Sequence, residues 1–135
     1  LETDIDDCTS EVLGYTMELL YEAGAREVHY IPIYMKKNRP AYELVVICGQ
    51  ADIDKLQNII FRQTTTIGIR RTAMERTILK RHMEKAVTPY GEVDIKVCEL
   101  PDGGTKRYPE YESVKKLCET QNVSYMDVIN SIKNI

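Results

Sequence analysis

The sequence predicts an α+β protein with a ferredoxin-like βαββαβ core, followed by a β-hairpin and two short C-terminal helices. Two observations lead to this class. In the first 75 residues, segments with strand and helix periodicity follow one another in the order of a split βαβ unit. Beyond them, an alternating segment next to a Pro-Tyr-Gly turn indicates a hairpin, and two helical segments follow. We therefore expect two subdomains, residues 1–75 and residues 76–135.

The first half of the core begins with a short strand over residues 1–6, which alternates loosely and ends in acidic residues. Thr9 is a good N-cap for a helix that starts near Ser10, and Gly24 ends that helix. Residues 28–35 are apolar on both faces, which suits a strand that is covered on both sides.

The second half of the core follows a polar turn at residues 37–40 and starts with a strand over residues 42–48. Asp52 is expected to cap a second helix, whose apolar residues repeat at helical spacing. The β-branched threonines at positions 64–66 favour strands and end that helix. Residues 67–73 are then expected to form the fourth strand.

The second subdomain holds the remaining elements. Residues 78–87 and 93–98 are expected to pair as a hairpin, because the second segment alternates cleanly. Two helices are expected after the Pro-Asp-Gly-Gly turn, over residues 112–120 and 125–133, and Ser124 is a good N-cap for the last one.

The composition is that of a folded domain that needs no covalent staples. Of the 135 residues, 43% are apolar and 29% are charged, as in ordinary globular proteins. At this length a folded chain hides roughly two-thirds of the surface of its unfolded form. The four cysteines form no CxxC pair, and the two histidines are isolated from them, so metal-site spacing is absent. We expect reduced, buried thiols in a cytoplasmic protein.

Composition also argues against two classes of partner. The longest apolar run covers residues 44–48, far short of the ~20 residues of a membrane helix. No signal peptide is visible. Eighteen basic and 21 acidic residues give a net charge of −3, which argues against a general nucleic-acid binder. Because the chain opens on Leu1, we expect it to be a domain of a longer protein.

Acidic residues gather at the start of the chain, at Glu2, Asp4, Asp6 and Asp7. The first three occupy alternate positions of the expected strand and share one face, where they repel one another unless a cation or a basic surface offsets them. Mg²⁺ and Mn²⁺ prefer such oxygen ligands, so these four residues are a candidate metal site. The competing interpretation is solvated charge that interacts with a helix dipole.

The turn between the two middle strands is basic, with Lys36, Lys37, Asn38 and Arg39 in succession. Two ammonium groups beside a guanidinium suit a polyphosphate, which needs several donors. Lysine is also common at exposed turns because it favours solubility, and that alternative stays open.

A third polar group follows the second helix, with Thr64, Thr65, Thr66 and then Gly68 and Arg70. Adjacent hydroxyls, a glycine that permits close backbone approach and an arginine suit a phosphate or a sugar. The Walker A motif is missing. Threonines also suit a junction between a helix and a strand.

A fourth candidate group lies near the end of the chain. It consists of Lys106, Glu110 and Glu112 around a Tyr-Pro pair. The alternative is that these residues only form the start of a helix.

These clusters, in this order, resemble the C-terminal domain of the LarC family, the nickel insertion proteins that complete the nickel-pincer nucleotide cofactor of lactate racemase. The resemblance covers nearly the whole chain, and its MKKNRP and TTTIGIR motifs are fairly specific. Ser10 stands where the family usually has proline. The matching stretches are LETDIDD (1–7), PIYMKKNRPAYEL (32–44), FRQTTTIGIR (61–70), TPYGEVDIKV (88–97) and PEYE (109–112).

The resemblance implies an enzyme of the lyase class, a nickel chelatase that cleaves cytidine triphosphate (CTP) with Mn²⁺ or Mg²⁺ while it inserts nickel into a pyridinium bisthiocarboxylate mononucleotide. The implied partners are CTP, the nickel-free pincer nucleotide precursor, the N-terminal part of the same protein and further copies in a trimer-based oligomer. Phosphate chemistry needs metal and cations. The four acids are therefore expected to bind metal, and the nucleotide is assigned to Lys36, Lys37, Asn38, Arg39, Thr64, Thr65, Thr66, Arg70 and Lys106.

Two other functions compete with this one. A nucleotide-sensing regulatory domain of ferredoxin-like fold would bind a nucleotide without catalysis. A nucleic-acid module is suggested by the helix–turn–helix outline of residues 114–132, but its second helix carries only Lys133 as a base. Metal-dependent cleavage of the nucleotide distinguishes the enzyme from the sensor.

Overall fold

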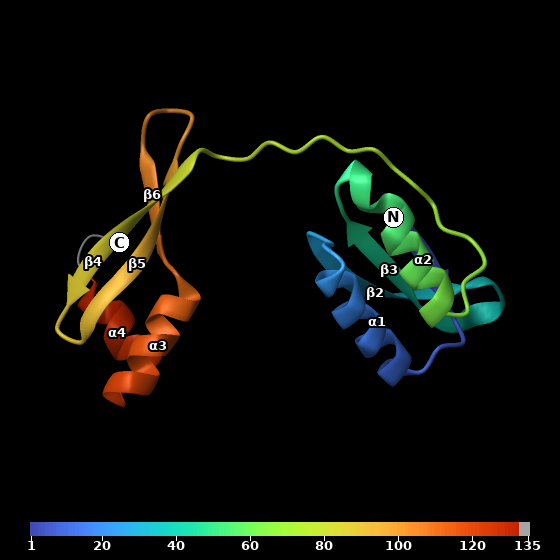
Figure 1. Ribbon diagram of the computed structural model, residues 1–135, viewed down its shortest axis with the longest axis horizontal. Helices are drawn as coiled ribbons and strands as arrows, with labels where there is room; N and C mark the ends of the chain where they lie inside the picture. Colours follow the sequence, from blue (N-terminus) through green and yellow to red (C-terminus); the bar gives the residue numbers. More distant parts are fainter. Residues whose placement is uncertain (133–135) are drawn as a thin grey trace. The chain divides into compact units, whose positions relative to one another are not determined.

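The computed structural model describes residues 1–132, which form two compact units. The first unit is Leu1–Met74, and the second begins at Glu75. Each unit has a three-stranded antiparallel sheet and a hydrophobic core of its own (Figure 1). The predicted α+β class is confirmed. None of the described helices is long and apolar enough to cross a bilayer.

The first unit places β3 between β1 and β2, and both neighbours run antiparallel to it. Two helices and two short 3-10 turns connect and follow the strands. The elements are β1 (Glu2–Ile5), α1 (Ser10–Glu22), β2 (Glu27–Met35), η1 (Lys36–Asn38), β3 (Arg39–Ile47), η2 (Gln50–Asp52) and α2 (Ile53–Gln63).

The expected fourth strand over residues 67–73 is reduced to a single antiparallel bridge between Glu2 and Arg70. The Glu2 amide donates to the Arg70 carbonyl at 3.0 Å, and the Arg70 amide donates to the Glu2 carbonyl at 2.8 Å. This bridge lies on the side of β1 away from β3, where a ferredoxin-like sheet has its fourth strand. Because β1 is only four residues long, it offers a fourth strand little to pair with.

One face of the first sheet packs on α1 and α2 (Figure 1). Thr3 and Ile5 of β1 are buried on that face, while Glu2 and Asp4 lie on the opposite face, which we call the open face. The first core consists of Ile5, Leu13, Leu20, Ala23, Val28, Leu44, Val46, Leu56 and Ile60.

The helix ends of the first unit follow local rules except at α2. The Thr9 side chain accepts a hydrogen bond from the Val12 amide at 3.4 Å, and Gly24 has a φ of +100° just after the last turn of α1. Both expectations for α1 are confirmed. Asp52 occupies the N-cap position of α2 as expected, but its side chain makes no capping hydrogen bond.

The second unit contains a sheet in the order β4-β5-β6, with α3 and α4 packed on the core around β5. The predicted hairpin is confirmed, whereas β6 was not expected, because its sequence Thr-Lys-Arg-Tyr-Pro shows no apolar alternation. The predicted last helix ends at Lys133, which lies outside the described residues. The elements are β4 (Arg81–Thr88), β5 (Gly91–Glu99), β6 (Thr105–Pro109), α3 (Tyr111–Gln121) and α4 (Tyr125–Ser131).

Candidate functional site

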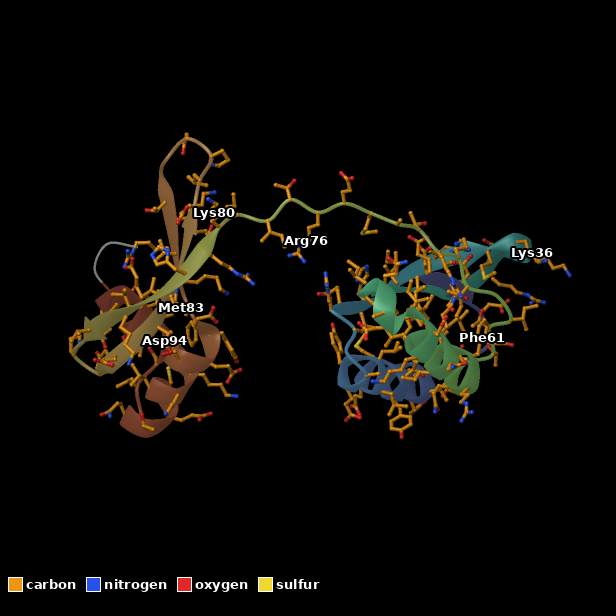
Figure 2. All side chains as sticks on the ribbon, turned by 45° about the horizontal axis from the view of Figure 1, so that its top comes forward. Lys36, Phe61, Arg76, Lys80, Met83 and Asp94 are labelled. Carbon is orange, nitrogen blue, oxygen red and sulfur yellow. The ribbon has the colours of Figure 1, made fainter. Side chains whose placement is uncertain are left out.

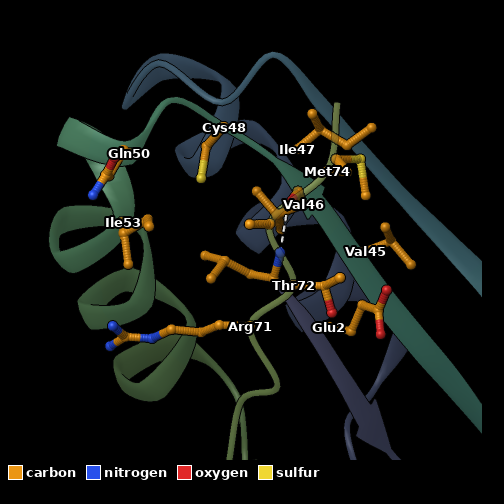
Figure 3. Close-up of a pocket in the computed structure, with 12 residues that line it drawn as sticks. Glu2, Val45, Val46, Ile47, Cys48, Gln50, Ile53, Arg71, Thr72 and Met74 are labelled. Atoms are coloured by element: carbon orange, nitrogen blue, oxygen red, sulfur yellow. Dashed lines mark hydrogen bonds between the residues drawn. The ribbon is translucent and has the colours of Figure 1, made fainter. Parts of the chain in front are cut away.

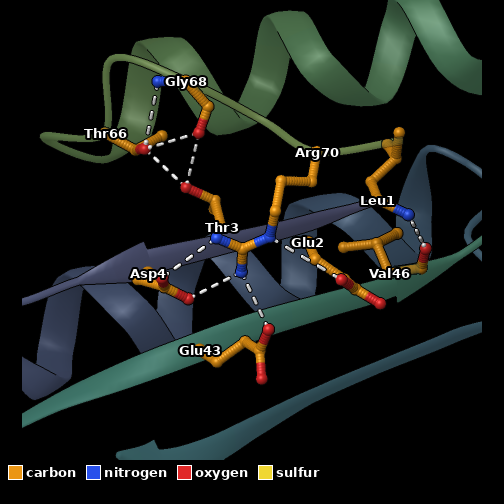
Figure 4. Close-up of polar contacts among 9 residues, drawn as sticks. All are labelled: Leu1, Glu2, Thr3, Asp4, Glu43, Val46, Thr66, Gly68 and Arg70. Carbon is orange, nitrogen blue, oxygen red and sulfur yellow. Dashed lines mark hydrogen bonds and ion pairs between the residues drawn. The ribbon is translucent and has the colours of Figure 1, made fainter. Parts of the chain in front are cut away.

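Arg70 is the centre of an ionic cluster on the open face (Figure 4). Its guanidinium donates to both carboxylate oxygens of Asp4, at 3.0 and 2.8 Å, and to Glu43 at 2.9 Å. Its Nε lies 3.7 Å from a carboxylate oxygen of Glu2. One arginine thus joins β1 to the neighbouring β3 through side chains, in addition to its backbone bridge to Glu2.

This arrangement sets the electrostatics of the open face. The hydrogen bonds from Arg70 hold the pKa of Asp4 below its usual range, and Asp4 together with Glu43 raises the pKa of Arg70. Glu43 was missed by the sequence analysis. It lies directly opposite Asp4 in the strand register, so a register assignment would have found it.

A hydroxyl pair fixes the segment after α2 against β1. Thr3 is buried, and its hydroxyl lies 2.5 Å from the Thr66 hydroxyl and donates to the Gly68 carbonyl at 2.8 Å. Thr64 uses its hydroxyl to bond the Ile60 carbonyl at the end of α2. Two of the three predicted threonines therefore have structural roles.

The end of the sheet at the β2–β3 turn gathers residues from three connections. Arg39, at the start of β3, contacts Asp6 at 3.0 Å. The Thr65 hydroxyl donates to Asp7, and the Thr65 amide donates to the sulfur of Cys8 at 3.4 Å. We call this end of the first unit, with the turn η1, the tip site.

The turn η1 has an unusual backbone. Lys37 and Asn38 have φ values of +62° and +55°, a left-handed conformation that costs about 1–3 kcal/mol for residues other than glycine when the surrounding structure imposes it. None of the ion pairs within residues 1–132 involves Lys36 or Lys37. Figure 2 shows Lys36 extending from the end of the hairpin. Two ammonium charges are therefore available to a ligand.

The structure thus divides the predicted site residues. Arg70 engages Glu2 and Asp4, so these two acids already have a cationic partner. Lys106 lies in the second unit, opposite Cys98, and its role in nucleotide binding stays a prediction. The tip site collects Asp6, Asp7, Lys36, Lys37, Asn38, Arg39 and Thr65.

Within residues 1–132, no three side chains of His, Cys, Asp or Glu stand together in a way that holds a metal ion. A metal site made of all four predicted acids stays a prediction. Any metal that binds Glu2 or Asp4 must compete with Arg70, while Asp6 contacts Arg39 and Asp7 accepts a hydrogen bond from the Thr65 hydroxyl.

A separate pocket of about 560 Å³ lies where the fourth strand is missing (Figure 3). It is bounded by the end of β3, the start of α2 and the segment 71–74. Arg71 turns away from the sheet and donates to Gln57 of α2. The sequence carried no signal for this pocket, because the fourth strand was expected to fill the space.

Fold and tip site together define an α+β domain with a candidate anion-binding end. A family model described as nickel insertion protein matches residues 1–129. The chain therefore belongs to the nickel insertion protein family, and the resemblance carried by its motifs is confirmed.

Curated relatives include two proteins named pyridinium-3,5-bisthiocarboxylic acid mononucleotide nickel insertion protein. The one from Alkaliphilus metalliredigens is 49% identical over 133 residues, which are 98% of this chain and 31% of the relative. The one from Acetivibrio thermocellus is 41% identical over 133 residues, 98% of this chain and 32% of the relative. The chain spans about a third of the length of these relatives.

Two solved structures share the fold. LarC2, described as the C-terminal domain of a cyclometallase involved in the synthesis of the NPN cofactor of lactate racemase, matches with a TM-score of 0.88 at 41% identity. The match covers 96% of this chain and 90% of that one. A protein from Methanopyrus kandleri matches with a TM-score of 0.70 at 24% identity, over 94% and 78% of the two chains. This second likeness concerns the fold alone.

Replacing Arg70 by alanine is expected to lower the free energy of unfolding at pH 7 by up to about 1 kcal/mol, since the arginine is more than half exposed. Because Arg70 depresses the pKa of Asp4 in the folded state, its stabilising effect is present above the unfolded pKa, near 4, and is lost as the pH falls through the folded pKa. Urea unfolding at pH 7 and pH 3 should show the difference shrinking.

The control for this comparison is Arg76→Ala, which removes an exposed arginine from the segment that precedes β4. It should change stability little at either pH. A difference between Arg70→Ala and the unaltered chain that stays constant from pH 7 to pH 3 would show that the Asp4 pair contributes nothing.

Proposed function

We propose that this chain is the nucleotide-binding domain of an enzyme that inserts nickel into a pyridinium bisthiocarboxylate mononucleotide, and that it binds and cleaves CTP with Mn²⁺ or Mg²⁺. The observation that carries the proposal is the tip site. There, Lys36 and Lys37, which form no ion pair within residues 1–132, precede Arg39 in a turn with left-handed backbone. Arg39 contacts Asp6, and the neighbouring Asp7 accepts a hydrogen bond from Thr65. Backbone strain of this kind concentrates at ligand sites. The names of the relatives support the pyridinium bisthiocarboxylate mononucleotide as the molecule that receives nickel.

The phosphates are assigned to the basic turn. Lys36 and Lys37 supply mobile ammonium groups, and Asn38 adds amide donors. Arg39 is neutralised by Asp6 at 3.0 Å in the structure. A metal–triphosphate complex offers each member of this pair a partner of opposite charge, because phosphate oxygens suit the guanidinium and the cation suits the carboxylate.

The divalent metal is assigned to Asp6 and Asp7. Mg²⁺ usually keeps several waters and binds one or two carboxylates together with substrate phosphates, so a preformed cluster of three ligands is not required. Asp6 and Asp7 would hold such a metal, which would supply positive charge to offset the charge that develops on the phosphates. The Thr65 hydroxyl donates a hydrogen bond to the Asp7 carboxylate and orients it. Glu2 and Asp4 are left out of this assignment, because Arg70 occupies them.

Nickel is the ion that the enzyme inserts, and we assign its handling to the remainder of a longer protein. Nickel prefers imidazole and thiolate ligands, whereas the tip site offers carboxylates, a hydroxyl and ammonium groups. The chain matches about a third of its relatives, which leaves room for an N-terminal part that receives the nickel-free precursor. We place this protein in the cytoplasm as a trimer-based oligomer.

CTP with Mn²⁺ is expected to stabilise the chain, by about 2.7 kcal/mol at a free concentration 100 times its Kd. The measurement is thermal unfolding with each of the four nucleoside triphosphates, with and without metal, followed by chromatography of the nucleotide. Equal shifts for all four would contradict a site that reads cytosine. Tight binding without cleavage would favour the regulatory alternative.

Lys37→Ala is expected to weaken CTP binding by about 1–3 kcal/mol, the scale of a hydrogen bond to a charged group. Stability should change little, because the lysine is exposed and both residues carry a Cβ at the same positive φ. Calorimetric titration measures the affinity of CTP for the Lys37→Ala variant and for the unaltered chain. Lys116→Ala, which removes an exposed lysine of α3, is the matched control. An unchanged Kd for Lys37→Ala would favour the alternative that the lysines of this turn serve only solubility.

The isolated chain is expected to bind metal and CTP without completing nickel insertion. The assay is maturation of the nickel cofactor with this chain, with the N-terminal part of a relative, and with both mixed. Activity is expected only where the N-terminal part is present. Full insertion by the chain alone would mean that it contains a nickel site of its own.

A further inference from the structure

The pocket shown in Figure 3 lies beside the end of β3, in line with β1. β1 pairs with β3 antiparallel, and Glu2 lies opposite Val45. Leu1 continues this ladder, because its nitrogen donates to the Val46 carbonyl and its carbonyl accepts from the Val46 amide, both at 2.8 Å. The chain runs on from β3 to Cys48, which lines the pocket. The pocket thus occupies the place that further residues of β1 would take.

Cys48 presents the backbone of an unpaired strand edge to this pocket. Along an antiparallel strand, the residues that bond one neighbour alternate with those that bond the other, so Cys48 turns its amide and carbonyl to the same side as Val46. Among residues 1–132, no other backbone group bonds the amide or the carbonyl of Cys48. Cys48 is half-buried, and backbone groups shielded from water rarely lack a partner. A strand beside Cys48 would supply both bonds.

The side chains of the pocket suit a strand that is apolar on one face. Leu1 and Val46 pack in the core between the sheet and the helices, and Ile53 begins α2 on the same side. Side chains alternate along a strand, so the second residue before Leu1 would share this face and lie opposite Cys48. An apolar side chain is expected at that position, where it would contact Ile53.

The segment after Arg70 is unpaired for a related reason. The bridge between Glu2 and Arg70 is followed by residues 71–74, which form no strand. If the register of this bridge continues, Thr72 lies beside the first residue before Leu1. A longer β1 would therefore give residues 71–74 a partner and complete the fourth strand.

We propose that the pocket binds the residues that directly precede Leu1 in a longer protein, and that these residues extend β1 between Cys48 and residues 72–74. The inference rests on the part of the proposed function that joins this chain to an N-terminal part, and the chain spans about a third of its relatives. In the longer chain the Leu1 nitrogen is an amide, which keeps its bond to Val46.

This placement fixes where the N-terminal part is attached. The turn η1 lies at the start of β3 and the pocket at its end. The nine residues of β3 span about 30 Å as an extended strand. The connection therefore leaves the first unit at the end of the sheet away from the tip site, and it leaves the basic turn open to a nucleotide.

The test compares the 135-residue chain with a version that begins about six residues earlier, an ordinary strand length. Mass spectrometry follows amide hydrogen exchange in the peptide that holds Cys48, and alkylation of the Cys48 thiol by iodoacetamide. The longer version is expected to slow both reactions at Cys48 about 10-fold. Cys118, which belongs to the second unit, is the internal reference and should react equally in both versions.

A variant within the pocket tests the apolar contact. Ile53→Glu places a carboxylate against the added strand and should restore fast alkylation of Cys48 in the longer version. Because an acidic residue is favourable in the first turn of a helix, α2 should persist. Gln50→Glu, which adds the same charge at an exposed position of η2, is the matched control. Should Ile53→Glu fold poorly, Ile53→Ser permits the same comparison.

The outcomes separate this inference from the function on which it rests. Equal reaction rates of Cys48 in the two versions overturn it. Protection of Cys48 that increases with the concentration of the 135-residue chain assigns the pocket to a second copy and also overturns it. Calorimetric titration of both versions with CTP and Mn²⁺ reports on the tip site alone. If neither version binds CTP, the nucleotide site is wrong, while slow reactions of Cys48 in the longer version still support the added strand.

Discussion

The contacts of Arg70 set the geometry of the first unit. β1 has four residues and a neighbouring strand only on its β3 side, so little backbone pairing holds it. Arg70 adds two backbone bonds to Glu2 and a bidentate pair to Asp4, and it reaches Glu43 on β3. With Arg70 in place, the preceding segment must run along β1, which brings the threonines against Thr3 and Asp7. The arrangement of the tip site therefore depends on an arginine that does not belong to it.

The order of elements could be predicted because it depends on local periodicity, and residues 1–63 follow that pattern. The fourth strand could not be predicted. Residues 67–73 have strand composition, but a strand also needs a partner of matching length, and β1 ends after four residues. The third strand of the second unit shows the opposite error, because it was not predicted and yet it forms. β6 pairs with β5 through its backbone, although its side chains carry no alternating pattern.

The chemistry of the site was predicted in part. Alternation placed Glu2, Asp4 and Asp6 on one face, but it does not say which cation offsets them. The structure supplies Arg70 and Arg39 from distant parts of the sequence. Which arginine pairs with each acid depends on strand register and on the path of the chain after α2. Neither can be inferred from the residue types alone. The proximity of Thr65 to Asp7 is likewise a product of the fold.

The left-handed turn at Lys37 and Asn38 also has a consequence for protein engineering. Glycine adopts a positive φ without steric cost, so a search for heat-resistant variants would favour glycine at both positions. Such variants would lose an ammonium group and an amide from the tip site. Selection for thermostability and selection for ligand binding would then favour different residues at these two positions. A library screened for melting temperature alone would lose Lys37 and Asn38 from the basic turn.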